Sequence, residues 1–202
     1  MSEKAPNEGR LIALEGTHGP DLAEATESLL HRLADHKKAC GVSRWDASNT
    51  FFEMRFAKSS VPPASARMLV LLYASDLAFR LRWEIEPALK EDKLVIAAPY
   101  VDTAVALGVA AGLPRRWLAD LFSFAPKPES VFRIEEKKKR WHSKCKPGDG
   151  FVEFCCSVLA NSYPYPDSAE VRGRGLEYLD ALKEKKGCSE LKKKAVAAIC
   201  EG

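Results

Sequence analysis

The chain has 202 residues, of which 46% are hydrophobic and 29% are charged, and its formal net charge is +3. These values suit one globular domain and exclude a disordered chain, a collagen-like chain and a disulfide-stabilised mini-protein. The charge is unevenly spread, because residues 1–135 carry 17 basic and 18 acidic side chains whereas residues 136–202 carry 14 and 10. We therefore expect a nearly neutral body followed by a mildly basic final third.

The sequence shows no targeting or membrane segment. Its first residues, MSEKAPNEGR, lack the apolar stretch of a secretory signal. The longest apolar run, Met68–Ala74, is far shorter than the about 20 residues that a membrane-spanning helix needs. The six cysteines form no CxxC pair, so no metal site is predicted. Together these features predict an intracellular protein in a reducing compartment that does not bind membranes.

Predicted strands and helices alternate along the first two-thirds of the chain. Short apolar runs predict strands at Leu11–Glu15, Val42–Arg44, Leu94–Ala98 and Ser130–Ile134. Helical spacing of apolar residues predicts helices over 22–33, Ala64–Lys90, Ala104–Ala111 and Pro114–Phe124. This order predicts a three-layer α/β fold, in which helices flank a parallel sheet, within a single domain over residues 1–202.

The pattern is weaker in residues 136–202. Phe151–Leu159 fits either a strand or a buried helix, while Val171–Lys186 and Ser189–Cys200 are predicted as helices. Two basic runs, residues 137–140 and 192–194, are by default solvated surfaces, and binding of a nucleic acid is the alternative. The residues of this candidate basic surface are Lys137, Lys138, Lys139, Arg140, Lys192, Lys193 and Lys194.

A candidate phosphate loop lies between the first predicted strand and the first predicted helix. Its residues of interest are Gly16, His18, Gly19, Asp21, Leu22 and Ala23. The GxxxxGK[ST] motif of that context needs glycine, lysine and a hydroxyl where this chain has Asp21, Leu22 and Ala23. Leu22 carries no charge for a phosphate, and Ala23 offers no hydroxyl to Mg²⁺. We therefore predict that the loop does not bind a nucleoside triphosphate in the usual way, and that His18 is a loop residue.

Several landmarks in the right order make residues 10–134 similar to the thymidylate kinase family, which is a family of P-loop nucleoside monophosphate kinases. They are the loop LIALEGTHGPDLA, the helix LLYASDLAFRL with the later IEPAL, the strand end VIAAPYVDT, the segment GLPRRWL and the segment FAPKPE. The resemblance implies the P-loop kinase fold, an ancestral phosphoryl transfer from ATP to dTMP with Mg²⁺, and a homodimer formed through helices on one face of the sheet.

The departures from the family fall on its chemistry. Ala98-Pro99-Tyr100 stands where the family has Asp-Arg-Tyr, and no arginine-bearing lid is recognisable in residues 136–202. By the resemblance, Arg44, Tyr73, Tyr100 and Asp102 match positions that line the acceptor pocket. Phosphoryl transfer depends on positioning and on charge stabilisation by Lys, Arg and Mg²⁺. The loss of several such groups together predicts no catalytic residues and no cofactor.

Two hypotheses remain open. The first is a degenerate family member, a pseudoenzyme that acts by binding a homodimer or protein partner in an assembly. The second is a divergent dTMP or nucleoside monophosphate kinase that uses ATP and Mg²⁺. The inert residues Leu22, Ala23, Ala98 and Pro99 favour the first, and the retained order of landmarks favours the second.

Overall fold

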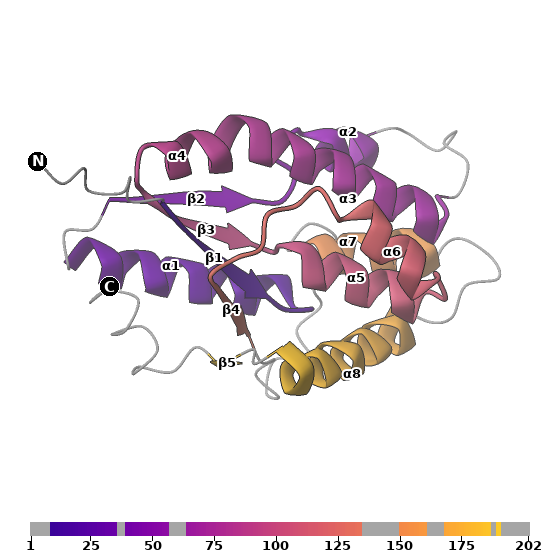
Figure 1. The fold of residues 1–202 in the computed structure, drawn as a ribbon. Coiled ribbons are helices and arrows are strands. Elements are labelled where there is room, and N and C mark those ends of the chain that lie inside the picture. The colour runs from indigo at the N-terminus through magenta and orange to yellow at the C-terminus, as the bar shows by residue number, and fades with distance from the viewer. Residues whose placement is uncertain are drawn as a thin grey trace, which may run out of the picture.

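The computed structural model describes residues 9–35, 39–56, 64–134, 150–160, 168–186 and 189–190. Its centre is a five-stranded parallel sheet with the order β2-β3-β1-β4-β5. The strands are β1 (Arg10–Glu15), β2 (Cys40–Arg44), β3 (Leu94–Ala98), β4 (Ser130–Arg133) and β5 (Ser189–Glu190). Figure 1 shows helices on both faces of this sheet, which confirms the predicted three-layer α/β fold.

The helices follow the predicted order, with one addition. They are α1 (Gly19–Asp35), α2 (Thr50–Phe56), α3 (Ala66–Arg80), the π-helical turn η1 (Leu81–Ile85), α4 (Glu86–Lys90), α5 (Val101–Ala110), α6 (Arg115–Leu121), α7 (Phe151–Ala160) and α8 (Ser168–Lys186). The long helix predicted over Ala64–Lys90 is confirmed as the rod α3-η1-α4, in which the π-helical turn η1 directly precedes α4 and its Pro87.

The sheet is buried on both faces because alternate residues of each strand pack into two different cores. In β1, Leu11 and Ala13 join the core under α3, α5 and α7, whereas Ile12 and Leu14 join the core under α1. Such two-sided burial explains why β1 and β3 read as continuous apolar runs. No helix in the described part of the chain is both long and apolar enough to cross a membrane.

The predicted start of the helix over Ser189–Cys200 is wrong, whereas residues 191–200 lie outside the described part of the chain. Ser189 and Glu190, predicted to begin a helix, instead pair in parallel with Phe132 and Arg133 of β4. The open edge of β4 offers backbone partners there, and helical periodicity within residues 189–200 cannot reveal that edge. Phe151–Leu159, where strand and helix were both open, is helical as α7.

Candidate functional site at the start of α1

The candidate site lies at the carboxyl edge of the sheet, where β1 ends and α1 begins. Gly19 is the first residue of α1, and Leu22 N–H closes the first turn by donating to the His18 carbonyl at 3.0 Å. The backbone N–H groups at such a helix start point outward and favour an anion. The resemblance places phosphate at this point of the fold.

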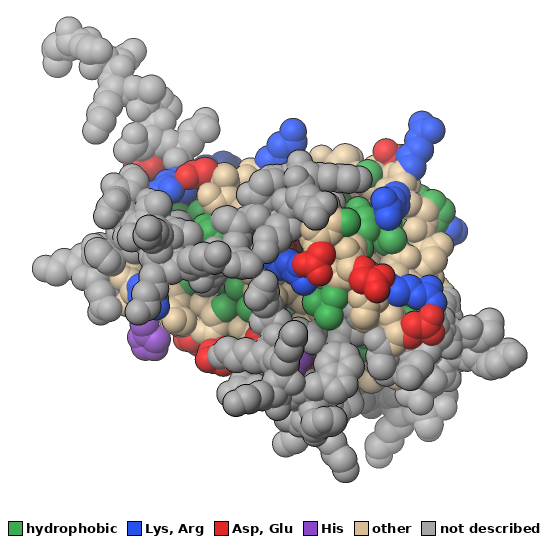
Figure 2. All heavy atoms as spheres, turned by 90° about the horizontal axis from the view of Figure 1, so that it is seen from below, with side chains coloured by type: hydrophobic (Ala, Val, Ile, Leu, Met, Phe, Trp, Pro, Cys, Tyr) green, Lys and Arg blue, Asp and Glu red, His purple; other side chains and the backbone are tan. Residues whose placement is uncertain are grey.

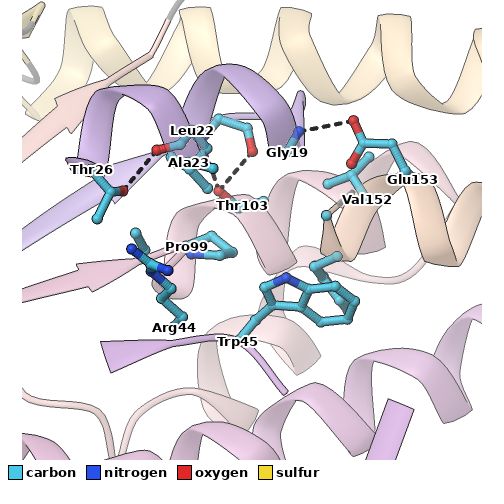
Figure 3. Close-up of a pocket in the computed structure, with 14 residues that line it drawn as sticks. Gly19, Leu22, Ala23, Thr26, Arg44, Trp45, Pro99, Thr103, Val152 and Glu153 are labelled. Atoms are coloured by element: carbon cyan, nitrogen blue, oxygen red, sulfur yellow. Dashed lines mark hydrogen bonds between the residues drawn. The ribbon is translucent and has the colours of Figure 1, made fainter. Parts of the chain in front are cut away.

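A carboxylate of the protein itself occupies this helix start. The Gly19 N–H donates to Glu153 Oε1 at 2.9 Å, although the two residues are 134 positions apart in the chain. Glu153 comes from the first turn of α7 and is only 5% exposed. Figure 3 shows its carboxylate pointing from α7 onto Gly19, so an internal anion meets the N–H that a phosphate would meet.

Close backbone contact holds the start of α7 against the loop. A Cβ atom added to Gly150 would lie 2.5 Å from the Gly19 Cα and 2.6 Å from Glu153 Oε2. Real Cβ atoms do not approach backbone this closely, so only glycine fits at position 150 in this arrangement. The loop and the start of α7 are therefore packed together, and the Glu153 hydrogen bond is one part of that contact.

The space left between the loop and α7 is small. A cavity of about 70 Å³ remains, and Figure 3 shows Leu22, Ala23 and Thr26 of α1 on one side and Arg44 and Trp45 on the other. Ligand pockets typically measure about 300–1,000 Å³. The cavity has room for a few water molecules. A nucleotide would have to displace the start of α7.

The loop's own side chains face inward. His18 and Asp21 are 8% and 3% exposed, and His18 Nδ1 lies 2.8 Å from Asp21 Oδ2. Leu22 packs into the core under α1 with Ile12 and Leu14, and Ala23 lines the cavity. The position where a phosphate-binding lysine was sought is thus a core position.

A second carboxylate at this edge serves α5. Glu15, the last residue of β1, accepts hydrogen bonds from the backbone N–H groups of Tyr100, Asp102 and Thr103 and from the Thr103 hydroxyl. The Thr103 Oγ1 also accepts from the Gly16 N–H at 3.1 Å, which connects the loop to α5. Burial, reinforced by the nearby Asp102 charge and opposed by these hydrogen bonds, raises the pKa of Glu15 to about 7.

The four residues matched to an acceptor pocket do not share an open pocket. Tyr73 and Tyr100 are 0% and 2% exposed, and their hydroxyls donate to backbone carbonyls, that of Tyr100 to Pro126. Asp102 is also buried, in the first turn of α5. Of the four, only Arg44 lines the cavity, and its guanidinium pairs with Glu27 of α1.

Aromatic side chains fill the region beside these residues. Phe151 lies 4.3 Å from Tyr73 between ring centroids and 5.7 Å from Phe51, while Phe154 lies 5.3 Å from Phe51. Trp45, at the end of β2, contacts the same rings. This aromatic cluster anchors α7 and thereby positions Glu153.

Sequence reasoning missed three residues of this region, namely Glu153, Gly150 and Arg80. Arg80 is fully buried, and its guanidinium donates to the Ser43 hydroxyl and to the carbonyls of Ser43 and Pro99, which joins the ends of β2 and β3. In the sequence, Arg80 can be recognised only as a polar residue at an inward-facing position of the helix that forms α3. The candidate basic residues at 137–140 and 192–194 lie outside the described residues.

Comparison with known proteins agrees with the landmarks in the sequence. The chain is 27% identical to a probable thymidylate kinase of Sulfurisphaera tokodaii over 66% of this chain and 67% of that protein. It is 26% identical to probable thymidylate kinase 2 of Saccharolobus solfataricus over 72% and 71%, and 36% identical to a probable thymidylate kinase of Pyrobaculum aerophilum over 61% and 63%. The chain is related to the thymidylate kinase family. No family model matches it.

The residues present do not fit the ATP and Mg²⁺ that a thymidylate kinase relationship implies. Glu15, Asp21, Asp102 and Glu153, all at most 7% exposed, place carboxyl groups in and around the loop. Each of these carboxyl groups that is ionised repels a triphosphate, which is itself an anion. The loop supplies neither a lysine nor a hydroxyl at the positions expected from the motif, so the two side chains that would hold the phosphates and their metal ion in that motif are missing.

Proposed function

We propose that this thymidylate-kinase-like protein has lost phosphoryl transfer and acts by binding a partner in an assembly. One observation carries the proposal: the Glu153 carboxylate accepts from the Gly19 N–H at the start of α1. That position is where a kinase of this fold would need a nucleotide phosphate. A pseudoenzyme can keep such an internal contact permanently, whereas a kinase would have to break it in every cycle.

Two further observations support the loss of activity. Leu22 packs into the core under α1, so the position that would carry the phosphate-binding lysine is apolar and buried. Arg44, the cation that lines the cavity, is already paired with Glu27. Removing one charge-stabilising group from an active site typically costs about a hundred- to a thousand-fold in rate. Several such groups are missing here, although their effects need not add.

The decisive experiment is a coupled ADP-release assay with dTMP, ATP and Mg²⁺, with an active thymidylate kinase assayed in parallel. We expect no dTMP-dependent ADP release. Turnover near 1 s⁻¹, about the lower end of kinase rates, would overturn the proposal and establish the divergent kinase instead.

Ligand binding is tested separately by thermal unfolding. A ligand at about one hundred times its Kd stabilises a protein by about 2.7 kcal/mol, which shifts the melting temperature measurably. We expect no shift with ATP, Mg²⁺ or dTMP at millimolar concentration. A clear shift without turnover would mean that the protein binds nucleotide as a ligand, and it would show that the contact of Glu153 with Gly19 opens.

A further inference from the structure

Three arginines gather around the start of α6. The Cζ atom of Arg67, in the first turn of α3, lies 5.2 Å from the centre of the Trp117 ring, and that of Arg115 lies 4.8 Å from the centre of the Tyr178 ring in α8. Arg116 is exposed and lies between Arg115 and Trp117 in α6. In Figure 1 these contacts join α6 to α3 above it and to α8 below it. We call Arg67, Arg115 and Arg116 the arginine cluster.

The arginine cluster has no carboxylate partner among the described residues. All three side chains are exposed, and within the described ranges they form no ion pair and donate no hydrogen bond. Three other arginines do pair with carboxylates, namely Arg10 with Glu129, Arg44 with Glu27 and Arg174 with Glu170. Figure 2 shows a similar mixing of charge on the face seen from below, where acidic and basic side chains lie beside one another. The arginine cluster therefore carries positive charge that no described carboxylate pairs with.

Acidic side chains are scarce in the elements that form the cluster. Residues 64–75 and 103–119, which include the cluster, contain no Asp or Glu. Asp120 follows Arg116 by about one turn of α6, and it is exposed. Glu177 in α8 is exposed as well. Neither forms an ion pair with the cluster in the part of the chain that the structure describes. This excess of positive charge favours an anionic partner.

The ring contacts leave the guanidinium donors of Arg67 and Arg115 available. A guanidinium stacked over a ring uses its face, whereas its N–H donors point outward in its own plane. This planar set of donors matches a carboxylate, which can accept two parallel hydrogen bonds. The ring contact also restricts the side chain before binding, so less conformational entropy is lost when a partner arrives. The cluster is therefore preorganised for carboxylates.

A short acidic peptide fits the cluster better than a nucleic acid does. Guanidinium groups already lie over the rings of Trp117 and Tyr178, so those ring faces are not free to stack on bases. Nucleic-acid interfaces are also extended and strongly basic. Residues 1–135 instead carry 17 basic and 18 acidic side chains, so a long polyanion would meet many negative charges beyond the cluster. A short segment would contact the cluster alone.

We propose that the arginine cluster binds a short acidic segment of a protein partner, whose carboxylates accept hydrogen bonds from Arg67, Arg115 and Arg116. The inference rests on the proposed function, because it supplies the chemistry of the partner that a non-catalytic protein would bind. The two can fail separately, since binding of an acidic peptide is measured without nucleotides and ADP release is measured without peptide.

Fluorescence anisotropy with a labelled oligoglutamate peptide at low ionic strength tests the surface. Combining Arg67→Gln, Arg115→Gln and Arg116→Gln should weaken binding about ten-fold, because three exposed ion pairs are lost together. The matched control combines Arg10→Gln, Lys93→Gln and Arg174→Gln, which removes three cations that already pair with carboxylates. Both variants lose the same net charge and keep the basic runs at 137–140 and 192–194. Equal weakening in the two, or none in the cluster variant, would overturn the inference.

Two further measurements do not depend on the triple variant folding. Arg116→Glu disturbs neither ring contact of the cluster and should weaken peptide binding several-fold, so an unchanged affinity would contradict the proposal. On wild-type protein, unlabelled oligoglutamate should displace the labelled peptide at lower concentration than single-stranded DNA of the same net charge. Stronger displacement by the DNA would overturn the choice of a peptide partner, whereas activity in the ADP-release assay would overturn only the proposed function.

Discussion

Two helix starts at the carboxyl edge of the sheet are both closed by a carboxylate, but from different sources. Glu15 reaches the start of α5 from β1, inside the core, and accepts four hydrogen bonds. Glu153 reaches the start of α1 from α7, across a chain separation of 134 residues. The first contact follows directly from strand pairing, whereas the second depends on a distant segment docking against the loop. We therefore expect the first to be the stronger structural element and the second to be the easier one to open.

Removing the Glu15 carboxylate should have the largest effect. Glu15→Ala leaves three buried backbone N–H groups without an acceptor and the Thr103 hydroxyl with only its longer 3.4 Å bond to the Gly16 carbonyl. Each buried donor left unpaired costs about 1–3 kcal/mol. Because neighbouring losses overlap, we expect the free energy of unfolding to fall by about 3–5 kcal/mol in urea titration. Glu15→Gln retains an acceptor and should lose clearly less. Equal losses in the two variants would contradict the role of these hydrogen bonds.

The second-largest effect should be a dependence of the free energy of unfolding on pH that arises from Glu15. Its pKa is raised to about 7 in the folded protein from an ordinary value of 4.5, so the folded state holds a proton that the unfolded state has released. Stability then falls as pH rises from 4.5 to about 7, by up to about 3 kcal/mol. The difference between wild type and Glu15→Gln over this range isolates the contribution. If the stabilities of the two proteins change in parallel with pH, Glu15 ionises with its ordinary pKa.

A methyl group at position 150 tests the packing of α7 against the loop. Gly150→Ala would place a Cβ atom 2.5 Å from the Gly19 Cα, and such overpacking costs about 1–3 kcal/mol. The control is Gly173→Ala in α8, where nothing lies within 4 Å and helix propensity predicts a gain of up to about 1 kcal/mol. If both variants are stabilised, α7 does not sit on Gly19.

The Glu153 contact should be weaker than the Glu15 network. Glu153→Ala removes a buried hydrogen-bond acceptor at a helix start, and we expect a loss of about 1–2 kcal/mol. The exposed Glu86→Ala variant is the control and should change stability by at most about 0.5 kcal/mol. Amide exchange at Gly19 should also become faster in Glu153→Ala. Unchanged exchange would mean that the carboxylate does not protect this N–H.

Restoring the motif in sequence should have the smallest effect. Leu22→Lys with Ala23→Thr returns the lysine and hydroxyl of a phosphate loop, yet we expect no measurable ATP binding by calorimetry. Asp21 remains in the loop, and the Glu153 carboxylate remains on Gly19. Micromolar affinity for ATP in the double variant would show that neither carboxylate blocks the loop. The triple variant with Glu153→Ala separates their contributions.

Much of the fold could be predicted from the sequence because its strongest signals are local. LIALE and LVIAA are continuous apolar runs, and both are strands buried on two faces. FVEFCCSVL was ambiguous because it is apolar almost throughout. Its helical state follows from Phe151 and Phe154, which are three residues apart and meet the same aromatic cluster.

The site was less predictable because its key contacts join distant segments. The sequence shows what the loop lacks at Leu22 and Ala23, but nothing near residue 20 indicates that Glu153 fills the space. Gly150 likewise lies in a segment that reads as a turn, and its close approach to Gly19 exists only in the folded chain. Tyr73 and Tyr100 matched pocket positions by resemblance, yet burial in the core determines their surroundings.

The separation of 134 residues between Gly19 and Glu153 also orders events in folding. The helix α1 needs only its own residues to form, whereas β1 must wait for its partner strands β3 and β4, and the Glu153 carboxylate arrives later still. Contacts of such long range carry a large loop-closure cost and form late. The nascent protein therefore passes through a stage in which the start of α1 is still open to anions in its surroundings.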